Sequence, residues 1–480
     1  MPRTRPFLVP VAAVAATGLI AVSAPSALAD TAGPAGACAA IGGAGASGPG
    51  SSGGSSFRTG AGSSAPMLRG TPGISLPVLD GPTQALQLLT GPGSPQRTDR
   101  QWGIAGTDLG IAFTGADGET FLAFGDTVAC DGSATDWRSN VLLRTGDSDY
   151  ADGLDVDQAL TRDGWTGQRA KAVEFIPSLK IPGVEHTVIP TSGVAVGDTL
   201  YVDYMSVRSW GAPGDWSTNY AATVRSEDDG ETWELVPESV RVNGDTNVAA
   251  RVIDALPLPA DLAAVRPGND NLQMTALAHG DDGFLYRVST PSGRFGDAVL
   301  SRVEAEAFPD ESAFTFWDGA KWREDAADAV PVIDGPVSEL SLSYNDYLDQ
   351  WVALYMVEGA GVVMRTADEL TGDWSRQRML VDVDTVPDLY GAFVLPHNDG
   401  PHLYYVATTW SDYNVMLMRT DLEESGSARS LRSVRDTTVD DGTEVVDVID
   451  YSDRVSTQDR IAVPASPAAD DADQLLDLLP

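Results

Sequence analysis

Short apolar runs alternate with polar turns over most of the chain. From Trp102 onward, hydrophobic and polar positions alternate, and Gly, Asp, Asn or Pro interrupts each run after a few residues. A period of two places alternate side chains on the same face of a strand, and few stretches show a helical period. The pattern predicts an all-β body over residues 101–424.

A hairpin unit recurs within this body. Each unit is an apolar strand, a tight turn with Gly, Asp or Asn, and a second strand rich in Tyr, Phe or Trp. The five units span residues 107–124, 192–205, 272–288, 340–355 and 390–406. Repeats spaced roughly 50 to 85 residues apart predict a five-bladed β-propeller, with each hairpin forming the inner half of a blade. A β-sandwich with accidental similarity is the alternative.

The ring of such a propeller needs a strand that closes it. We expect this strand either within residues 66–100, where 74–78 has the pattern of a single strand, or within residues 440–450. Either segment lies outside the five hairpins, so it is free to pair with the last blade.

One turn carries a recognisable propeller motif. Residues 226–233 read Ser-Glu-Asp-Asp-Gly-Glu-Thr-Trp and fit the Asp-box pattern S-x-D-x-G-x-T-W. In this turn the Ser hydroxyl and the Asp carboxylate bind the turn backbone while the Trp packs below. Residues 316–322 and 371–374 look like degenerate relatives. The motif indicates the fold and says nothing about function, because it sits on the outer rim of a blade.

The two ends of the chain differ from the body in composition. Residues 1–29 have the basic start, short apolar run and small-residue cleavage site of a secretory signal peptide. Residues 30–65 are mostly Gly, Ala and Ser, which predicts a flexible spacer before a propeller domain at 66–424. Residues 425–480 form an acidic segment with one candidate strand and a disordered tail. We therefore expect a secreted protein.

The charge balance restricts the partners. The formal net charge is −38, and it becomes −40 without the signal segment, which holds Arg3 and Arg5 but no acid. Such a field repels phosphate backbones and anionic lipid. We expect no nucleic-acid or membrane partner, a neutral substrate, and a monomer.

Cysteine and histidine give little support for a metal or cofactor. Cys38 and Cys130 could form one disulfide in an oxidising compartment or remain two thiols. No pair of cysteines has zinc-ligand spacing, and among the four histidines only His397 and His402 lie near each other in sequence. We expect no metal and no cofactor.

Candidate chemistry follows from the propeller geometry. The inner strands begin at the mouth of the central channel, so the residues at those starts face a shared pocket. They are Asp108, Thr191 or Ser192, Gln273, Glu339, and Asp388 or Tyr390. Two or three carboxyl groups among polar partners suit glycosidic cleavage, which needs one acid to protonate the leaving oxygen and one carboxylate to activate water or attack.

The first hairpin brings two of these carboxyl groups together. If its turn centres on Asp117, residues whose numbers sum to 234 are cross-strand partners, and Asp108 opposes Asp126. Their Cβ atoms would then lie about 4.5 to 5.5 Å apart. Like charges at that distance raise one pKa, which divides the pair into an acid and a base. The alternative is that both are turn or edge aspartates that bind backbone amides.

An ordered set of motifs in residues 101–424 resembles a known family. The motifs are Gly106-Thr-Asp-Leu-Gly, Phe124-Gly-Asp-Thr, Arg138-Ser-Asn, Trp216-Ser-Thr-Asn before the Asp-box, Gly293-Arg-Phe-Gly, Ser338-Glu-Leu-Ser and Leu389-Tyr-Gly-Ala-Phe. Together they are similar to the DUF-type five-bladed propellers recognised as endo-D-arabinanases, which cut the D-arabinofuranan of mycobacterial arabinogalactan and lipoarabinomannan. The resemblance implies a five-bladed propeller and assigns catalysis to Asp108 and Asp126. The family often has Gly where this chain has Ser338.

The remaining site predictions concern sugar binding. We expect Glu339 to hold the sugar or to tune the carboxyl pair, and we expect amide and hydroxyl groups near the channel to bind the substrate. These groups belong to Asn140, Thr191, Asn219, Gln273 and Tyr390.

Two other functions are compatible with the fold. A sialidase would need an arginine cluster, whereas this chain offers only scattered arginines such as Arg225 and Arg294. A non-catalytic carbohydrate-binding propeller would show the same aromatic residues without needing paired acids.

Overall fold

The computed structural model describes residues 76–422 except 80, 130–135, 182, 245–251, 253–264, 398–399 and 411–412. All of these residues belong to one compact unit of the chain, 32–480. The predicted signal peptide, the spacer, the acidic C-terminal segment, the candidate strand at 440–450 and both cysteines lie outside the described residues. No helix within the described ranges is long and apolar enough to cross a membrane.

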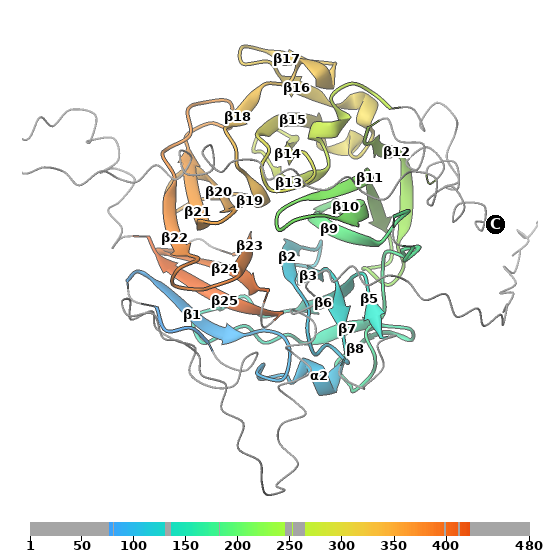
Figure 1. The fold of residues 1–480 in the computed structure, drawn as a ribbon, viewed down its shortest axis with the longest axis vertical. Coiled ribbons are helices and arrows are strands. Elements are labelled where there is room, and N and C mark those ends of the chain that lie inside the picture. The colour runs from blue at the N-terminus through green and yellow to red at the C-terminus, as the bar shows by residue number, and fades with distance from the viewer. Residues whose placement is uncertain are drawn as a thin grey trace, which may run out of the picture. The chain divides into compact units, whose positions relative to one another are not determined.

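Five antiparallel sheets surround a common centre (Figure 1). Blade 1 has β2 (Leu109–Thr114), β3 (Thr120–Phe124), β6 (Val141–Thr145), β7 (Gln158–Thr161) and β8 (Gly164–Thr166), and blade 2 has β9 (Thr187–Val196), β10 (Thr199–Trp210), β11 (Trp216–Ser226) and β12 (Glu234–Val242). Blade 3 has β13 (Met274–His279), β14 (Phe284–Thr290), β15 (Ala298–Glu304), β16 (Thr315–Trp317), β17 (Trp322–Arg323) and β18 (Pro331–Ile333). Blade 4 has β19 (Ser338–Asn345), β20 (Gln350–Val357), β21 (Gly361–Ala367) and β22 (Arg378–Asp382). Blade 5 has β23 (Leu389–Val394), β24 (His402–Thr409), β25 (Asn414–Asp421) and β1 (Thr83–Leu88).

The remaining elements are short. They are the strand pair β4 (Thr127–Val128) and β5 (Trp137–Arg138), the helix α2 (Thr98–Gln101), and the 3-10 turns η1 (Asn269–Asn271), η2 (Ala305–Ala307), η3 (Glu311–Ala313) and η4 (Ala326–Asp328).

The first strands of the blades form a closed ring. In order, β2, β9, β13, β19 and β23 each contact the next, and β23 contacts β2. Each of these strands is the first strand of one of the five repeats in the sequence, and its partner in the sheet is the second. The prediction of an all-β, five-bladed β-propeller is confirmed.

The N-terminal strand closes the ring. β1 pairs antiparallel with β25 at the outer edge of blade 5, and the hydroxyl groups of Thr83 and Thr420 are 2.8 Å apart. The closing strand therefore comes from within 66–100, as predicted. The expected strand at 74–78 is wrong over its described part, since residues 76–79 are irregular and Pro77 has no N–H to donate to a neighbouring strand; residues 74 and 75 lie outside the described residues.

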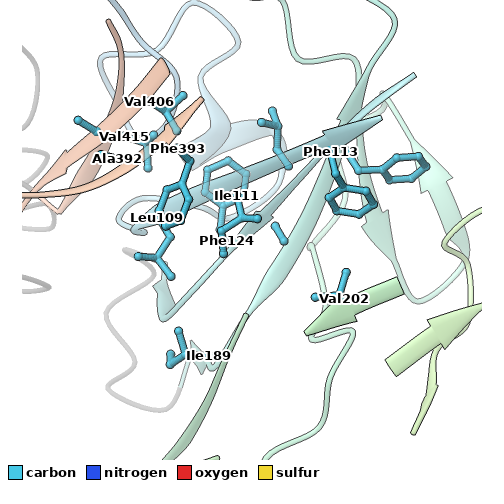
Figure 2. Close-up of a cluster of buried hydrophobic side chains, with 14 of the residues drawn as sticks. Leu109, Ile111, Phe113, Phe124, Ile189, Val202, Ala392, Phe393, Val406 and Val415 are labelled. Carbon is cyan, nitrogen blue, oxygen red and sulfur yellow. The ribbon is translucent and has the colours of Figure 1, made fainter. Parts of the chain in front are cut away.

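The blades pack through apolar faces of their inner hairpins. In Figure 2, Leu109 lies beside Phe393 and Val406 of blade 5, whereas Phe113 lies on the side of blade 2. A Cβ atom at Gly193 of β9 would lie 2.2 Å from a ring carbon of Phe113. Glycine is needed there because the ring of one blade rests directly on the backbone of the next.

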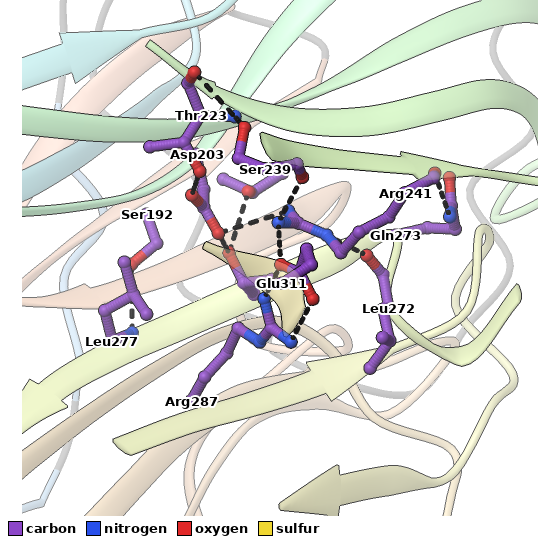
Figure 3. Close-up of polar contacts among 12 residues, drawn as sticks. Ser192, Asp203, Thr223, Ser239, Arg241, Leu272, Gln273, Leu277, Arg287 and Glu311 are labelled. Carbon is purple, nitrogen blue, oxygen red and sulfur yellow. Dashed lines mark hydrogen bonds and ion pairs between the residues drawn. The ribbon is translucent and has the colours of Figure 1, made fainter. Parts of the chain in front are cut away.

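A buried ion network joins blades 2 and 3 (Figure 3). Arg241 of β12 pairs with Asp203 of β10 at 3.2 Å and with Glu311 of η3 at 2.8 Å, and Glu311 also pairs with Arg287 of β14. Burial alone would raise the pKa of Glu311, but Arg287 and Arg241 lower it below its ordinary value. Two positive and two negative side chains thus compensate one another in a largely buried site.

The Asp-box forms the turn between β11 and β12, at the outer part of blade 2. The Ser226 hydroxyl accepts from Gly230 N at 2.9 Å, Asp228 accepts from Thr232 N at 2.8 Å, and Trp233 Nε1 donates to Gly230 O at 3.0 Å. The bonds of Ser226 and Asp228 are those that the sequence motif predicts, and the Trp233 bond is an additional one.

Candidate active site

One end of the ring, called the mouth here, collects two kinds of segment. The inner strands begin there, and the loops that join the second to the third strand of each blade return there because neighbouring strands are antiparallel. In blade 2, for example, Thr187 at the start of β9 pairs with Val207, and β10 then continues to the loop that ends at Trp216. Each blade can therefore supply side chains to the mouth from two places in the sequence.

Asp108 lies at the mouth, directly before β2, and is 9% exposed. Its Oδ2 accepts a hydrogen bond from the Tyr390 hydroxyl at 3.0 Å, and the Tyr413 hydroxyl also bonds to this carboxyl group. Its Oδ1 has no hydrogen-bond partner among the described protein groups. Burial, followed by the charge of Asp126, raises the pKa of Asp108 from 3.8 to about 8. The carboxyl group is therefore mostly protonated at neutral pH and has one free oxygen.

The predicted register of the first hairpin holds until the mouth and then shifts. Pairs whose numbers sum to 234 run from Thr114↔Thr120 to Ile111↔Ala123. A bulge between Leu109 and Ile111 then moves the pairing by one residue.

The direct pairing of Asp108 with Asp126 is consequently wrong, because Asp108 O accepts from Gly125 N at 3.2 Å. The cause is local backbone conformation. Leu109 and Gly110 have φ of 67° and 92°, which is the left-handed geometry that accommodates an extra residue in a strand. Asp108 and Asp126 remain near enough for their charges to interact.

Gly125 makes room for the carboxyl group of Asp108. A Cβ atom at Gly125 would lie 2.4 Å from Asp108 Oδ1. Any other residue at this position would push against the oxygen that has no protein partner.

Asp126 is held in a different environment. Its Oδ1 accepts from Trp137 Nε1 at 2.9 Å and from the Thr187 hydroxyl at 2.6 Å. Burial raises its pKa from 3.8 to about 6, and the bonds from Thr187 and Trp137 limit the rise. At neutral pH Asp126 is thus mostly ionised, while its neighbour Asp108 is mostly protonated.

Glu339 enters the mouth from the fourth blade. It adopts φ 40°, and its Oε1 accepts from Arg294 Nε at 3.0 Å and from Arg294 Nη2 at 2.7 Å. Its Oε2 accepts from the Ser338 hydroxyl at 2.9 Å. The resembled family often has Gly at the position of Ser338. The Ser338 hydroxyl therefore gives Glu339 a hydrogen bond that glycine could not provide. Arg294 also binds Glu358 at 2.8 Å.

Arg294 connects this ion cluster to the carboxyl pair. Its guanidinium carbon lies 5.1 Å from the ring centre of Tyr390 and 5.9 Å from that of Trp216. Tyr390 in turn bonds to Asp108. The structure thus brings together Asp108, Asp126, Glu339 and Tyr390, four of the residues that the sequence placed in the site.

Three amide residues expected to bind substrate have structural roles instead. Asn140, Asn219 and Gln273 are fully buried. The Asn140 amide donates to Ile176 O and Val188 O. The Asn219 amide donates to Val184 O and Ser206 Oγ. The Gln273 amide donates to Asn269 O and Arg241 O. Buried amides need such partners, and these bonds fasten neighbouring backbone segments to one another at the mouth end of the blades.

Thr191 is also displaced from its expected position. β9 begins at Thr187, so Thr191 lies further along the channel, where its hydroxyl is 3.2 Å from that of Thr275. Thr187 takes the place at the mouth and bonds to Asp126.

Comparison with known proteins identifies the family. The model of the family described as Domain of unknown function (DUF4185) matches residues 93–419. The chain belongs to the DUF4185 family. The DUF4185 chain is similar to Notoamide biosynthesis cluster protein J of Aspergillus sp. (strain MF297-2), with 26% identity over 351 residues, 68% of this chain and 86% of that protein. Protein J' of Aspergillus versicolor is 27% identical over 338 residues, 66% of this chain and 84% of that protein.

Solved structures share parts of the arrangement at low identity. A putative hydrolase from Bacteroides ovatus has a TM-score of 0.45 and 10% identity, and the match covers 67% of the DUF4185 chain and 86% of that chain. The catalytic domain of the Coprinopsis cinerea GH62 alpha-L-arabinofuranosidase has a TM-score of 0.40 and 13% identity, with coverage of 74% and 99%. The strand pairing within the DUF4185 chain itself defines its five blades.

Several mouth residues of the DUF4185 chain escaped the sequence analysis as members of the site. Arg294 and Tyr413 come from loops between second and third strands, and Trp216 is the first residue of β11, whereas the sequence prediction relied mainly on the starts of inner strands. Trp137 begins β5 within the long connection from β3 to β6. The signal that could have found them is the antiparallel order, which returns those loops to the same end.

The channel beyond the mouth offers little chemistry. A cavity there is lined by residues from all five inner strands, among them Ile111, Thr191, Leu277, Leu340 and Phe393, and none of its lining residues is a carboxylate. Within the described ranges, no group of three or more His, Cys, Asp and Glu side chains could hold a metal ion. Asp108 and Asp126, whose pKa values burial raises, lie at the mouth and are not among these lining residues.

Proposed function

We propose that the protein is a secreted glycoside hydrolase, an endo-D-arabinanase that cleaves α-D-arabinofuranosidic linkages inside arabinogalactan and lipoarabinomannan of mycobacterial-type cell walls. The observation that carries the hydrolase assignment is the pair of neighbouring carboxyl groups at the mouth, with pKa of about 8 for Asp108 and about 6 for Asp126. Two carboxyl groups whose environments separate their pKa values are the arrangement that glycosidic cleavage requires. The motif resemblance supports the choice of arabinan.

The two carboxyl groups take opposite parts in the reaction. Asp108 carries the proton and has a free Oδ1, so it donates the proton to the leaving glycosidic oxygen as the bond to the anomeric carbon breaks. Asp126, ionised at the same pH, takes a proton from the water that attacks that carbon. The water supplies the new hydroxyl group. Asp126 then releases its proton to solvent and Asp108 takes one up from solvent, which restores the starting state.

The neighbouring hydroxyl and indole groups stabilise each step. Tyr390 and Tyr413 bond to Asp108 and hold its charge once the proton has left. Trp137 and Thr187 fix one oxygen of Asp126, which leaves the other for water. Hydrogen bonds to an ionised carboxylate are the stronger kind.

The electrostatics favour a neutral sugar over an acidic one. Arg294, the arginine beside Tyr390, is paired with both Glu339 and Glu358 and is not free to bind a sugar carboxylate. This arrangement disfavours sialidase activity. A purely binding propeller would have no use for a protonated and an ionised carboxyl group side by side.

Incubation with mycobacterial arabinogalactan, followed by chromatography of the products, tests the proposal. A ladder of arabinan oligosaccharides with new reducing ends is expected, and Asp108→Asn and Asp126→Asn should each lower turnover by at least ~10²-fold. Binding of the polymer without new reducing ends would contradict the proposal and leave a carbohydrate-binding propeller. Near-normal turnover in both folded variants would remove the assigned chemistry from this pair.

A further inference from the structure

Large aromatic side chains remain exposed around the mouth. Trp210 is 45% exposed, Phe295 is 52% exposed and Trp410 is 43% exposed. Trp210 ends β10, Phe295 follows Arg294 between β14 and β15, and Trp410 follows the end of β24. Exposed apolar surface that gathers in one place beside polar groups often marks a ligand-binding site.

The Trp210 side of the mouth is held in place by its neighbours. The Trp210 ring lies 5.7 Å from the Trp216 ring, nearly edge to face. The loop between the two tryptophans is fixed by a bond from Arg294 N to Gly214 O at 2.8 Å. The exposed indole is therefore presented in one orientation and loses little freedom when a ligand covers it.

The Trp410 side is built in the same manner and adjoins the carboxyl pair. The Trp410 ring lies 6.0 Å from Tyr390 and 5.5 Å from Tyr413. Both tyrosines bond to Asp108. A ligand resting on Trp410 is thus next to the group that carries the proton.

The two sides form one continuous row. Its members, each about 6 Å or less from the next, are Trp210, Trp216, Arg294, Tyr390 and Trp410. Asp108 bonds to Tyr390 between the two exposed tryptophans.

We propose that Trp210 and Trp410 are stacking platforms for sugar units on opposite sides of the cleaved bond. This inference rests on the proposed function, because it takes the ligand to be a glycan chain. An indole face suits the C–H face of a sugar ring, whereas Asp126, Glu339 and Glu358 around the row disfavour an anionic chain. A chain held on both sides of the carboxyl pair is cut at internal bonds.

Binding measured without turnover tests the platforms. In the Asp108→Asn background, calorimetry with arabinan oligosaccharides released from mycobacterial arabinogalactan by mild acid should show each of Trp210→Ala and Trp410→Ala weakening binding by about tenfold. Trp210→Phe and Trp410→Phe should recover part of the affinity, which separates loss of the platform from misfolding.

Tyr344→Ala is the matched control. Tyr344 is 44% exposed and its ring lies 5.5 Å from Trp351, yet it stands at the far end of β19 from Glu339. Binding should not change in this variant.

The outcomes separate this inference from the proposed function. Unchanged binding in either Trp→Ala variant overturns the two-sided platform even if the wild-type protein cleaves the polymer. Trp-dependent binding by a wild-type protein that releases no reducing ends supports the platforms and refutes the hydrolase. If the oligosaccharides do not bind at all, the inference is wrong.

Discussion

Replacing Asp108 by Asn should lower turnover by at least ~10²-fold and stabilise the fold. The folded protein holds this carboxyl group at a pKa of about 8, against an ordinary value of 3.8. Below the ordinary value both folded and unfolded chains carry the proton, so the group has no effect on stability. As the pH rises from there to about 8, the unfolded chain releases a proton that the folded chain keeps. The wild-type protein therefore loses stability over this window and reaches a plateau above it.

The magnitude follows from the size of the shift. One pKa unit corresponds to about 1.4 kcal/mol, so the ionisation of Asp108 opposes folding by about 6 kcal/mol on the plateau and by about 4 kcal/mol near pH 7. Asn has a similar shape and does not ionise. Because its amide must still fit beside Gly125, we expect the variant to gain at least about 2 kcal/mol near pH 8 and nothing near pH 4.

Urea unfolding followed by tryptophan fluorescence at a series of pH values measures this difference. The unfolding free energy of the wild-type protein, relative to the variant, should fall by up to about 1.4 kcal/mol per pH unit between about pH 5 and pH 7. Asp198→Asn, at an exposed position in the turn after β9, is the control and should leave the pH dependence unchanged. Equal stability of wild type and Asp108→Asn at every pH would refute the reasoning.

Three other changes test separate parts of the structure. The pH profile of turnover should be bell-shaped with a maximum near neutrality. Activity needs Asp126 ionised, with a pKa of about 6, and Asp108 protonated, with a pKa of about 8. A profile with a single limb would contradict this division of roles. Glu311→Gln should lower the unfolding free energy by about 3 to 5 kcal/mol in denaturant titrations, since it leaves buried positive charge uncompensated, and a loss below about 1 kcal/mol would contradict the role of the ion network. Gly125→Ala should reduce turnover by about a hundredfold in steady-state assays, because the added Cβ atom would press on Asp108. Gly400→Ala is the control and should be neutral, because a Cβ atom there would have nothing within 4 Å. Equal rates for the two variants would exclude this crowding.

Much of the fold was readable from the sequence because strands and tight turns are local features. The alternation of apolar residues located all five inner hairpins, and counting outward from Asp117 gave the correct register as far as Ile111. The one-residue bulge was not readable, because nothing in the sequence indicates that Leu109 adopts a positive φ. That conformation is imposed by the ring of blades around it, which is a tertiary effect.

The site was only partly predictable for a related reason. Polar residues near strand ends look alike in sequence whether they face a ligand or bind buried backbone, and Asn140 and Gln273 belong to the second kind. Arg294 and Tyr413 lie in loops that meet the inner strands only once the antiparallel sheets have formed. Their positions depend on the antiparallel order of the strands. An alternation of apolar and polar residues does not reveal that order.

The pairing of β1 with β25 has a consequence for the order in which the molecule can be assembled. Thr83 and its partner Thr420 are separated by 337 residues, so the first of the described strands to leave the ribosome waits for the last of them. Contacts between such distant residues carry a large loop-closure cost and slow folding. Until β25 is available, β1 has an unpaired edge that can join another chain. A permuted chain that begins at blade 1 and carries β1 after β25 would turn this last step into formation of a local hairpin, and should close its ring faster while keeping the same mouth.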